Sequence, residues 1–213
     1  MKASQFVRAL AEVRFANTFN PYADRCSRDD RGDAPAIRRR NLVAILEEAE
    51  RLQTSAIWIG RDLGFRGGRR TGLALTDDVH VERHGERWGV SLERPTIGEI
   101  VRERTATVVW KLLSQVDAAV FLWNVFPFHP HRQGQPFSNR SHKAAEAECG
   151  RAILHELVEI LRPEKLVMIG NDAAKSARRV CSRTDMTQVR HPSYGGQRQF
   201  RAQICGLYRL PVA

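Results

Sequence analysis

Long apolar runs are absent from this sequence. No stretch approaches the roughly 20 consecutive apolar residues that a membrane-spanning helix requires. Residues 1–14 mix charged with apolar positions and contain no continuous apolar segment of the kind found in signal peptides. We therefore expect a soluble protein of the cytoplasm that does not insert into a membrane.

Cysteine is scarce: Cys26, Cys149, Cys181 and Cys205 are far apart in the chain. They form no C-x-x-C pair, and no histidine lies at the spacing of a zinc finger. Structural disulfides are not expected in a reducing compartment. An iron–sulfur cluster would need all four thiols to converge, and no local pattern indicates this, so we expect neither a metal nor a cofactor.

Acidic side chains are the minority, since 24 Asp and Glu stand against 34 Lys and Arg, for a formal net charge of +10. Arginine outnumbers lysine heavily, and its planar fork of donors suits phosphate oxygens. Nucleic acid is the expected partner, although charge alone leaves simple solubility or an anionic membrane surface open. The arginine run 38–40 is typical of a solvated helix face.

Strand-like and helix-like segments alternate along a chain whose length suits a single domain, residues 1–213. The pattern predicts a three-layer αβα sandwich around a short, mainly parallel four-stranded sheet, with ligands at the carboxyl ends of the strands. Polar residues 24–35 predict a solvated loop. Apolar runs predict strands at 55–60, 118–123, 165–170 and 187–189, and helical periodicity predicts helices at 4–16, 37–51, 97–113, 143–161 and 172–180.

Polar residues follow three of these strands. The loop at 60–76 has five glycines and one carboxylate, Asp62, at the strand tip, but it has neither the Walker pattern nor G-x-G-x-x-G. It is either a phosphate-binding loop or an ordinary glycine-rich turn.

Asn124 follows the second strand and His191 the last. The amide of Asn124 offers a donor and an acceptor that match O4 and N3–H of uracil, or it caps a loop. A lone histidine is usually structural, but His191 precedes a Gly-Gly turn at a strand end and can reach a shared cleft.

In this order and at these strand ends, three segments resemble the motifs of the uracil-DNA glycosylase superfamily: Gly60-Arg61-Asp62, Asn124-Val125 and His191-Pro192-Ser193. The resemblance extends to residues 71–74, 141–143 and 169–174. It implies an enzyme that flips uracil out of DNA and hydrolyses its N-glycosidic bond, releasing uracil and leaving an abasic site.

The resemblance also assigns roles. Asp62 would orient the hydrolytic water, Asn124 would hold the uracil edge, and His191 would stabilise the departing base through O2. The rest of the base pocket would be Gly60, Arg61, Phe65 and Leu75, and the residues expected to bind DNA are Arg66, Arg69, Arg70, Ser193, Tyr194 and Arg198.

Three positions depart from the best-known members of this superfamily. Gly64 stands where they have a tyrosine that excludes the 5-methyl group of thymine, so a broader range of bases is expected. Leu75 replaces a phenylalanine that stacks on the base, and Gly195 replaces the leucine that wedges into the duplex. Stacking is then expected from Phe65, unless that ring is a core residue anchoring the loop, and wedging from Tyr194 or Arg198.

No lysine stands in the three strand-end motifs, so a Schiff base is not expected and the predicted enzyme is a monofunctional, monomeric glycosylase acting on uracil-containing DNA. One alternative is a non-catalytic protein that binds uracil-containing or abasic DNA. Another is a nucleotide-binding α/β enzyme. We expect the histidines at 129, 131 and 142 to be exposed or to face DNA, and Asp77 and Asp78 to cap a loop.

Overall fold

The computed structural model describes residues 1–180 and 184–211, and Cys181 lies outside this range. Its first half contains α1 (Ala3–Glu12), β1 (Thr18–Phe19), α2 (Ala34–Arg51), β2 (Ala56–Asp62), α3 (Gly68–Thr71), α4 (Val81–Trp88) and α5 (Arg104–Leu113). Its second half contains β3 (Val120–Phe126), β4 (His129–Pro130), α6 (Ala144–Leu161), β5 (Lys165–Ile169), α7 (Asn171–Ala177), β6 (Asp185–Val189) and α8 (Gln197–Tyr208).

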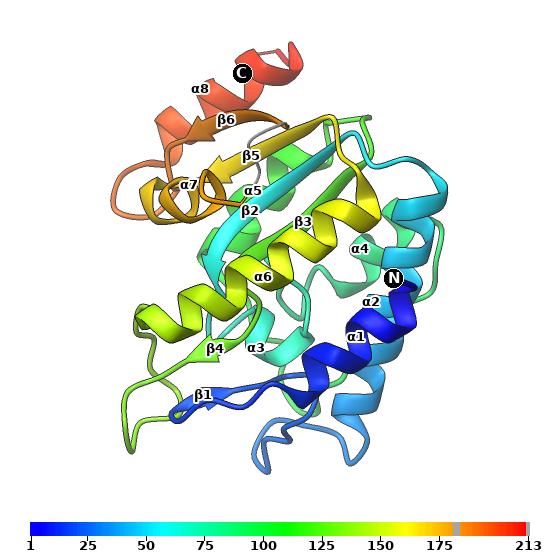
Figure 1. Cartoon of the computed structure of the whole chain (residues 1–213), viewed down its shortest axis with the longest axis vertical. Coiled ribbons are helices and arrows are strands. Elements are labelled where there is room, and N and C mark those ends of the chain that lie inside the picture. Colours follow the sequence, from blue (N-terminus) through cyan, green and yellow to red (C-terminus); the bar gives the residue numbers. More distant parts are fainter. Residues whose placement is uncertain (181–183, 212–213) are drawn as a thin grey trace.

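The main sheet has the strand order β3-β2-β5-β6, and each neighbouring pair is parallel. Gly60 of β2 lies opposite Asn124 of β3, and Ile169 of β5 lies opposite Val189 of β6. All four carboxyl ends therefore meet along one edge, which is the geometry the sequence predicted (Figure 1).

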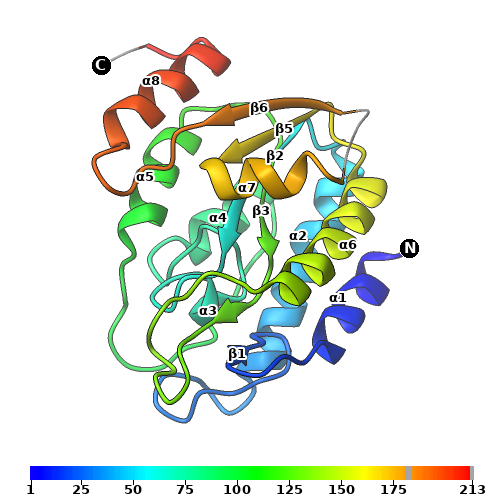
Figure 2. The same cartoon turned by 60° about the vertical axis from the view of Figure 1, so that its left-hand side comes forward.

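Helices cover both faces of this sheet (Figure 2). Because side chains alternate along a strand, Ile57 and Ile59 pack with α1, α2, α6 and α7, whereas Trp58 packs with α5 and α8. Fully burying one such side chain contributes about 1.5–3 kcal/mol. The predicted three-layer αβα sandwich around a parallel four-stranded sheet is confirmed.

Several helix boundaries differ from the expectation. The helix expected at 97–113 begins only at Arg104, because Asp77 and Asp78 accept the backbone N–H groups of Glu103 and Val101 and hold that stretch as a loop. Helices α4 and α8 were not anticipated. Within the described residues, none of the helices has the length and apolar character needed to cross a bilayer.

Three arginines expected on the surface are buried. Arg38, in the run read as a solvated helix face, is fully enclosed and bonds Asp30 at 2.5 Å; Asp30 belongs to the loop 24–35, which is therefore not wholly solvated. Arg70 bonds Asp78 at 2.7 Å, and the guanidinium of Arg69 lies 4.2 Å from the centre of the Phe19 ring. Arg69 and Arg70 are therefore interior side chains, 3% and 4% exposed, rather than the surface cations that the DNA-binding prediction assumed.

Candidate active site

The sheet order decides which predicted site residues meet. Asp62 ends β2, Asn124 lies near the end of its neighbour β3, and His191 follows β6. Strand β5 lies between β2 and β6, and its end leads into α7 through Gly170. Three segments separated by at least 60 residues thus line one edge.

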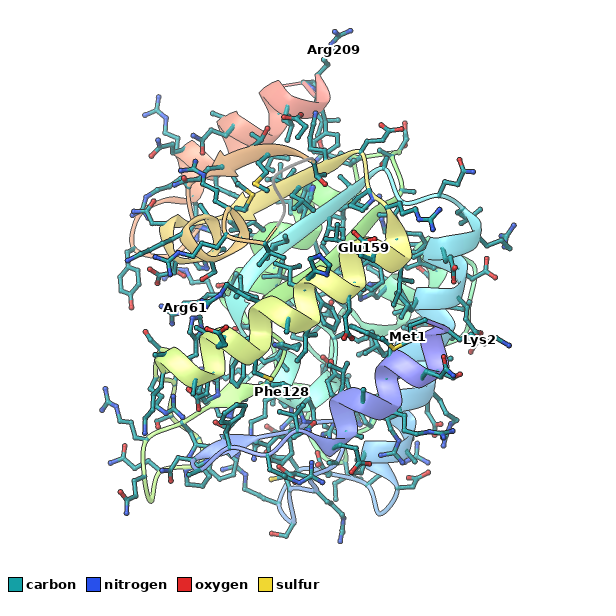
Figure 3. All side chains as sticks on the ribbon, in the orientation of Figure 1. Met1, Lys2, Arg61, Phe128, Glu159 and Arg209 are labelled. Carbon is teal, nitrogen blue, oxygen red and sulfur yellow. The ribbon has the colours of Figure 1, made fainter. Side chains whose placement is uncertain are left out.

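Asp62 is held by two basic side chains. Its side chain is 6% exposed, and Oδ2 accepts a hydrogen bond of 2.7 Å from Nε of Arg61. Oδ1 bonds Nδ1 of His142, at the start of α6. Arg61 also reaches Asp172 of α7 at 2.8 Å, and its side chain lies between α6 and α7 (Figure 3). Each carboxylate oxygen keeps a further lone pair that can accept from a water molecule.

His142 is a site residue whose role the sequence did not reveal. Its side chain is 11% exposed, so of the two expectations, an exposed or a DNA-facing histidine, the first was wrong. The available signal was the resemblance over residues 141–143, but nothing in the spacing indicated a contact across 80 residues. The bond to His142 keeps Asp62 in one orientation at the strand tip.

The amide of Asn124 points to a second part of the site. The residue is 1% exposed, and within the described residues its Oδ1 has no hydrogen-bond partner. Gly60 leaves the space beside that oxygen, since a Cβ there would collide with Oδ1 and lie 3.3 Å from Cδ2 of Leu75. A buried acceptor without a partner is costly, so this one is suited to a ligand N–H.

Leu75 forms the wall opposite the amide. Its φ of 54° lies in the left-handed region, which non-glycine residues rarely adopt. The indole N–H of Trp110 in α5 donates to its carbonyl at 3.1 Å and holds this conformation. Gly60, Leu75 and Asn124 therefore lie together, as the predicted base pocket requires.

His191 is oriented by its own loop. The backbone N–H of Ser193 donates to its Nδ1 at 3.1 Å, so the neutral ring carries its proton on Nε2. Burial, together with the positive charges of Arg61 and Arg190, lowers the pKa of His191 below its ordinary value. Gly170, with φ of +93°, lets the ring pack closely, because a Cβ there would lie 3.1 Å from that of His191. The imidazole is thus a neutral N–H donor at pH 7.

The remaining predicted residues lie at the rim. Phe65 is half-buried, outside both hydrophobic core clusters of the described residues, and its N–H donates to Asn139 at 3.1 Å. Arg66 is exposed, 6.0 Å from the Phe65 ring. Tyr194 is 98% exposed with φ of 52°, and Arg198 is exposed at the start of α8. These side chains are free to contact a large ligand.

A cationic groove that sequence reasoning missed adjoins Asp62. It encloses about 400 Å³ between α6 and α7. Arg61 and Arg151 pair with Asp172 and Glu148. The other cations of the groove are exposed and, within the described residues, make no ion pair: Lys143, Lys175 and Arg179.

Other candidate groups proved structural. His129 is fully buried, and burial together with Arg69 lowers its pKa to about 3, so it does not face solvent or DNA. Asp77 accepts the N–H of Val79 and so caps its loop, as predicted. Over residues 1–180 and 184–211, no three His, Cys, Asp or Glu side chains are grouped as metal ligands.

Known proteins resemble this chain at two levels. A family model described as the Uracil DNA glycosylase superfamily matches residues 48–204. The crystal structure of wild-type SMUG2 from Pedobacter heparinus is similar, with a TM-score of 0.63 and 13% sequence identity over 99% of this chain and 98% of that one. At this identity the structural likeness shows the fold alone. No curated protein matches the sequence.

Proposed function

Since this chain belongs to the uracil-DNA glycosylase superfamily, we propose that it is a monofunctional glycosylase that flips uracil out of DNA and hydrolyses its N-glycosidic bond. The observation that carries the proposal is the buried Oδ1 of Asn124, which has no hydrogen-bond partner among the described residues and lies opposite Gly60, two residues before the strand-end carboxylate Asp62. An acceptor there fits N3–H of uracil, and the amide N–H₂ fits O4. Cytosine presents the opposite pattern, an acceptor at N3 and a donor at C4.

We assign Asp62 two roles, orienting the attacking water and stabilising the charge that develops on the sugar. As the bond from C1′ to N1 breaks, positive charge develops on the sugar, and an ionised carboxylate stabilises it while orienting the attacking water. Arg61 and His142 both bond the oxygens of this carboxylate and fix its orientation toward the sugar. Water supplies the hydroxyl group at C1′, and its remaining proton neutralises the departing base.

We assign His191 the role of stabilising the departing base. Uracil departs as an anion whose charge is shared by O2, and a neutral imidazole donating from Nε2 stabilises that oxygen. The bond from Ser193 N–H to Nδ1 selects the tautomer that this role requires. A neutral donor avoids the cost of burying a second cation beside Arg61.

The exposed rim is assigned to DNA. We assign Tyr194, exposed in the loop after β6, to the space that the flipped base leaves, and Arg66, Ser193 and Arg198 to the flanking strand. The groove between α6 and α7 supplies cations that replace the buried Arg69 and Arg70 in this role. Phosphate contacts of this kind position the duplex and carry little sequence information.

The test is an oligonucleotide with one uracil, incubated with protein and then treated with alkali. Wild-type protein should yield a strand break only after alkali, and Asp62→Asn should slow its formation by about 100-fold or more. Asp117→Asn changes an exposed carboxylate just before β3, far from the site, and serves as the matched control. No break with wild-type protein on single- and double-stranded substrates would remove the uracil assignment.

A further inference from the structure

Glu103 is a carboxylate that the proposed reaction does not use. It lies at the N-cap of α5, and its backbone N–H donates to Asp77 at 2.6 Å. Its side chain extends under the loop that follows Asp62, where a Cβ at Gly64 would collide with one of its oxygens and a Cβ at Gly67 with the other. The two glycines thus leave room for this carboxylate two residues beyond Asp62.

Among the residues that the structure describes, the Glu103 carboxylate has no hydrogen-bond or ion-pair partner. Within the described residues the hydrogen bonds of Glu103 are those of its backbone, to Asp77 and Thr107. Burial and the negative charge of Asp77 raise its pKa to about 7, with Arg66 opposing them. Half-buried carboxylates are normally paired or hydrogen-bonded, so this one is available to a ligand.

The orientation of the base places one of its edges toward Glu103. When Asn124 holds N3 and O4, and His191 holds O2, the C5 atom lies across the ring from C2 and faces away from β6. The loop after β2 turns in that direction, because the N–H of Leu63 donates to the carbonyl of Phe128 beyond β3 at 3.1 Å. Gly64, with no side chain, lies next along this loop.

Helix α5 links Glu103 to the pocket wall. Trp110, two turns after Glu103, holds the carbonyl of Leu75, and Leu75 borders the space beside Gly60. The carboxylate beside Gly64 and the wall at Leu75 are therefore both held by helix α5.

We propose that Glu103 is a specificity-determining residue that selects bases with a hydrogen-bond donor on the C5 substituent, such as 5-aminomethyluracil and 5-hydroxymethyluracil. This inference rests on the proposed function, and the hydrolysis is the same: water adds to C1′ and the base leaves. An ammonium or hydroxyl group donates to the carboxylate, whereas the methyl group of thymine leaves it unpaired and buried.

The test compares excision of uracil, thymine, 5-hydroxymethyluracil and 5-aminomethyluracil from otherwise identical oligonucleotides. Wild-type kcat/KM should be higher for the two donor-bearing bases than for thymine, with 5-aminomethyluracil first. Glu103→Ala should lower the ratio of 5-aminomethyluracil to uracil by about tenfold or more, the size expected for a hydrogen bond to a charged group. Glu103→Gln should retain most of the preference for hydroxymethyl and lose that for aminomethyl.

Glu99→Ala, which removes an exposed carboxylate four residues earlier, is the control and should leave every ratio unchanged. Uracil excision with ratios that are equal in Glu103→Ala and Glu99→Ala would overturn this inference while leaving the proposed function intact. If no base is excised, binding affinity tests the inference instead. The same oligonucleotides are then bound to the Asp62→Asn variant and to the double variant that carries Asp62→Asn and Glu103→Ala. A preference for the donor-bearing bases that Glu103→Ala abolishes supports the inference, and equal affinities reject it.

Discussion

At the scale of single residues, the orientation of Asp62 depends on His142, which lies 80 residues away in the sequence. A carboxylate at a strand tip has several rotamers, and a partner on another element restricts them further than the neighbouring Arg61 does alone. Because His142 touches Asp62 and no reacting atom, we class it as a positioning residue.

His142→Ala is therefore expected to lower kcat by roughly 10- to 100-fold, the cost of a catalytic group displaced by about 1 Å, with little change in KM. His142→Asn keeps a donor on a shorter side chain and should recover part of the loss. His131→Ala, which removes a half-buried loop histidine, is the comparison. Equal kcat values for His142→Ala and His131→Ala would contradict the positioning role.

The site residues that the sequence identified are those whose positions follow from the neighbouring sequence alone. Asp62, Asn124 and His191 each follow a strand-like run directly, so parallel pairing alone predicts that they meet. His142 and Glu103 come from a loop and a helix cap, and their positions depend on how α5 and α6 pack. No periodicity in the sequence encodes that packing.

At the scale of elements, the strand pattern predicted the sheet because buried parallel strands are almost continuously apolar. The same reasoning failed at residues 97–103. Apolar residues there continue the helical spacing of α5, but Asp77 and Asp78 compete for the backbone N–H groups that a first turn would leave free. Side chains 20 residues or more upstream thus decide where the helix begins.

Two elements also form the groove that we assign to DNA. If Lys143 at the start of α6 and Lys175 in α7 each neutralise one phosphate, Lys143→Gln and Lys175→Gln should each reduce the slope of log K against log salt concentration by about 0.7–0.9. Fluorescence anisotropy from 50 to 300 mM salt measures this slope. Lys111→Gln, on the outer face of α5, is the matched control. If all three variants have the same slope, the groove does not bind DNA.

At the scale of the whole molecule, the excess of arginine serves both the interior and the surface. Arg38 and Arg70 are fixed by Asp30 and Asp78, and removing one member of such a pair leaves an uncompensated buried charge. The composition predicted a negatively charged partner but not which arginines contact it. A buried and an exposed arginine look the same in the sequence, because the carboxylate that pairs with the buried one is identified only in the fold.

Buried neutral groups also determine how stability depends on pH. His84 is 2% exposed, bonds Thr76 at 3.0 Å and meets the edge of Trp110. Burial, with Arg87 nearby, lowers its pKa to about 3 from 6.5. The unfolded chain therefore binds a proton at this residue below about pH 6.5 that the folded protein does not bind, so its contribution to stability is present above that pH and is lost as the pH falls.

Between pH 6 and 4, the free energy of unfolding should fall more steeply with decreasing pH for wild-type protein than for His84→Asn, by about 1.4 kcal/mol per pH unit. The comparison uses the slopes, so a lower absolute stability of the variant does not affect it. Urea unfolding at half-unit steps of pH measures both slopes, and His155→Asn, which changes an exposed histidine on α6, should keep the wild-type slope. A His84→Asn slope equal to that of wild type would show that the folded protein protonates His84 as readily as the unfolded chain does.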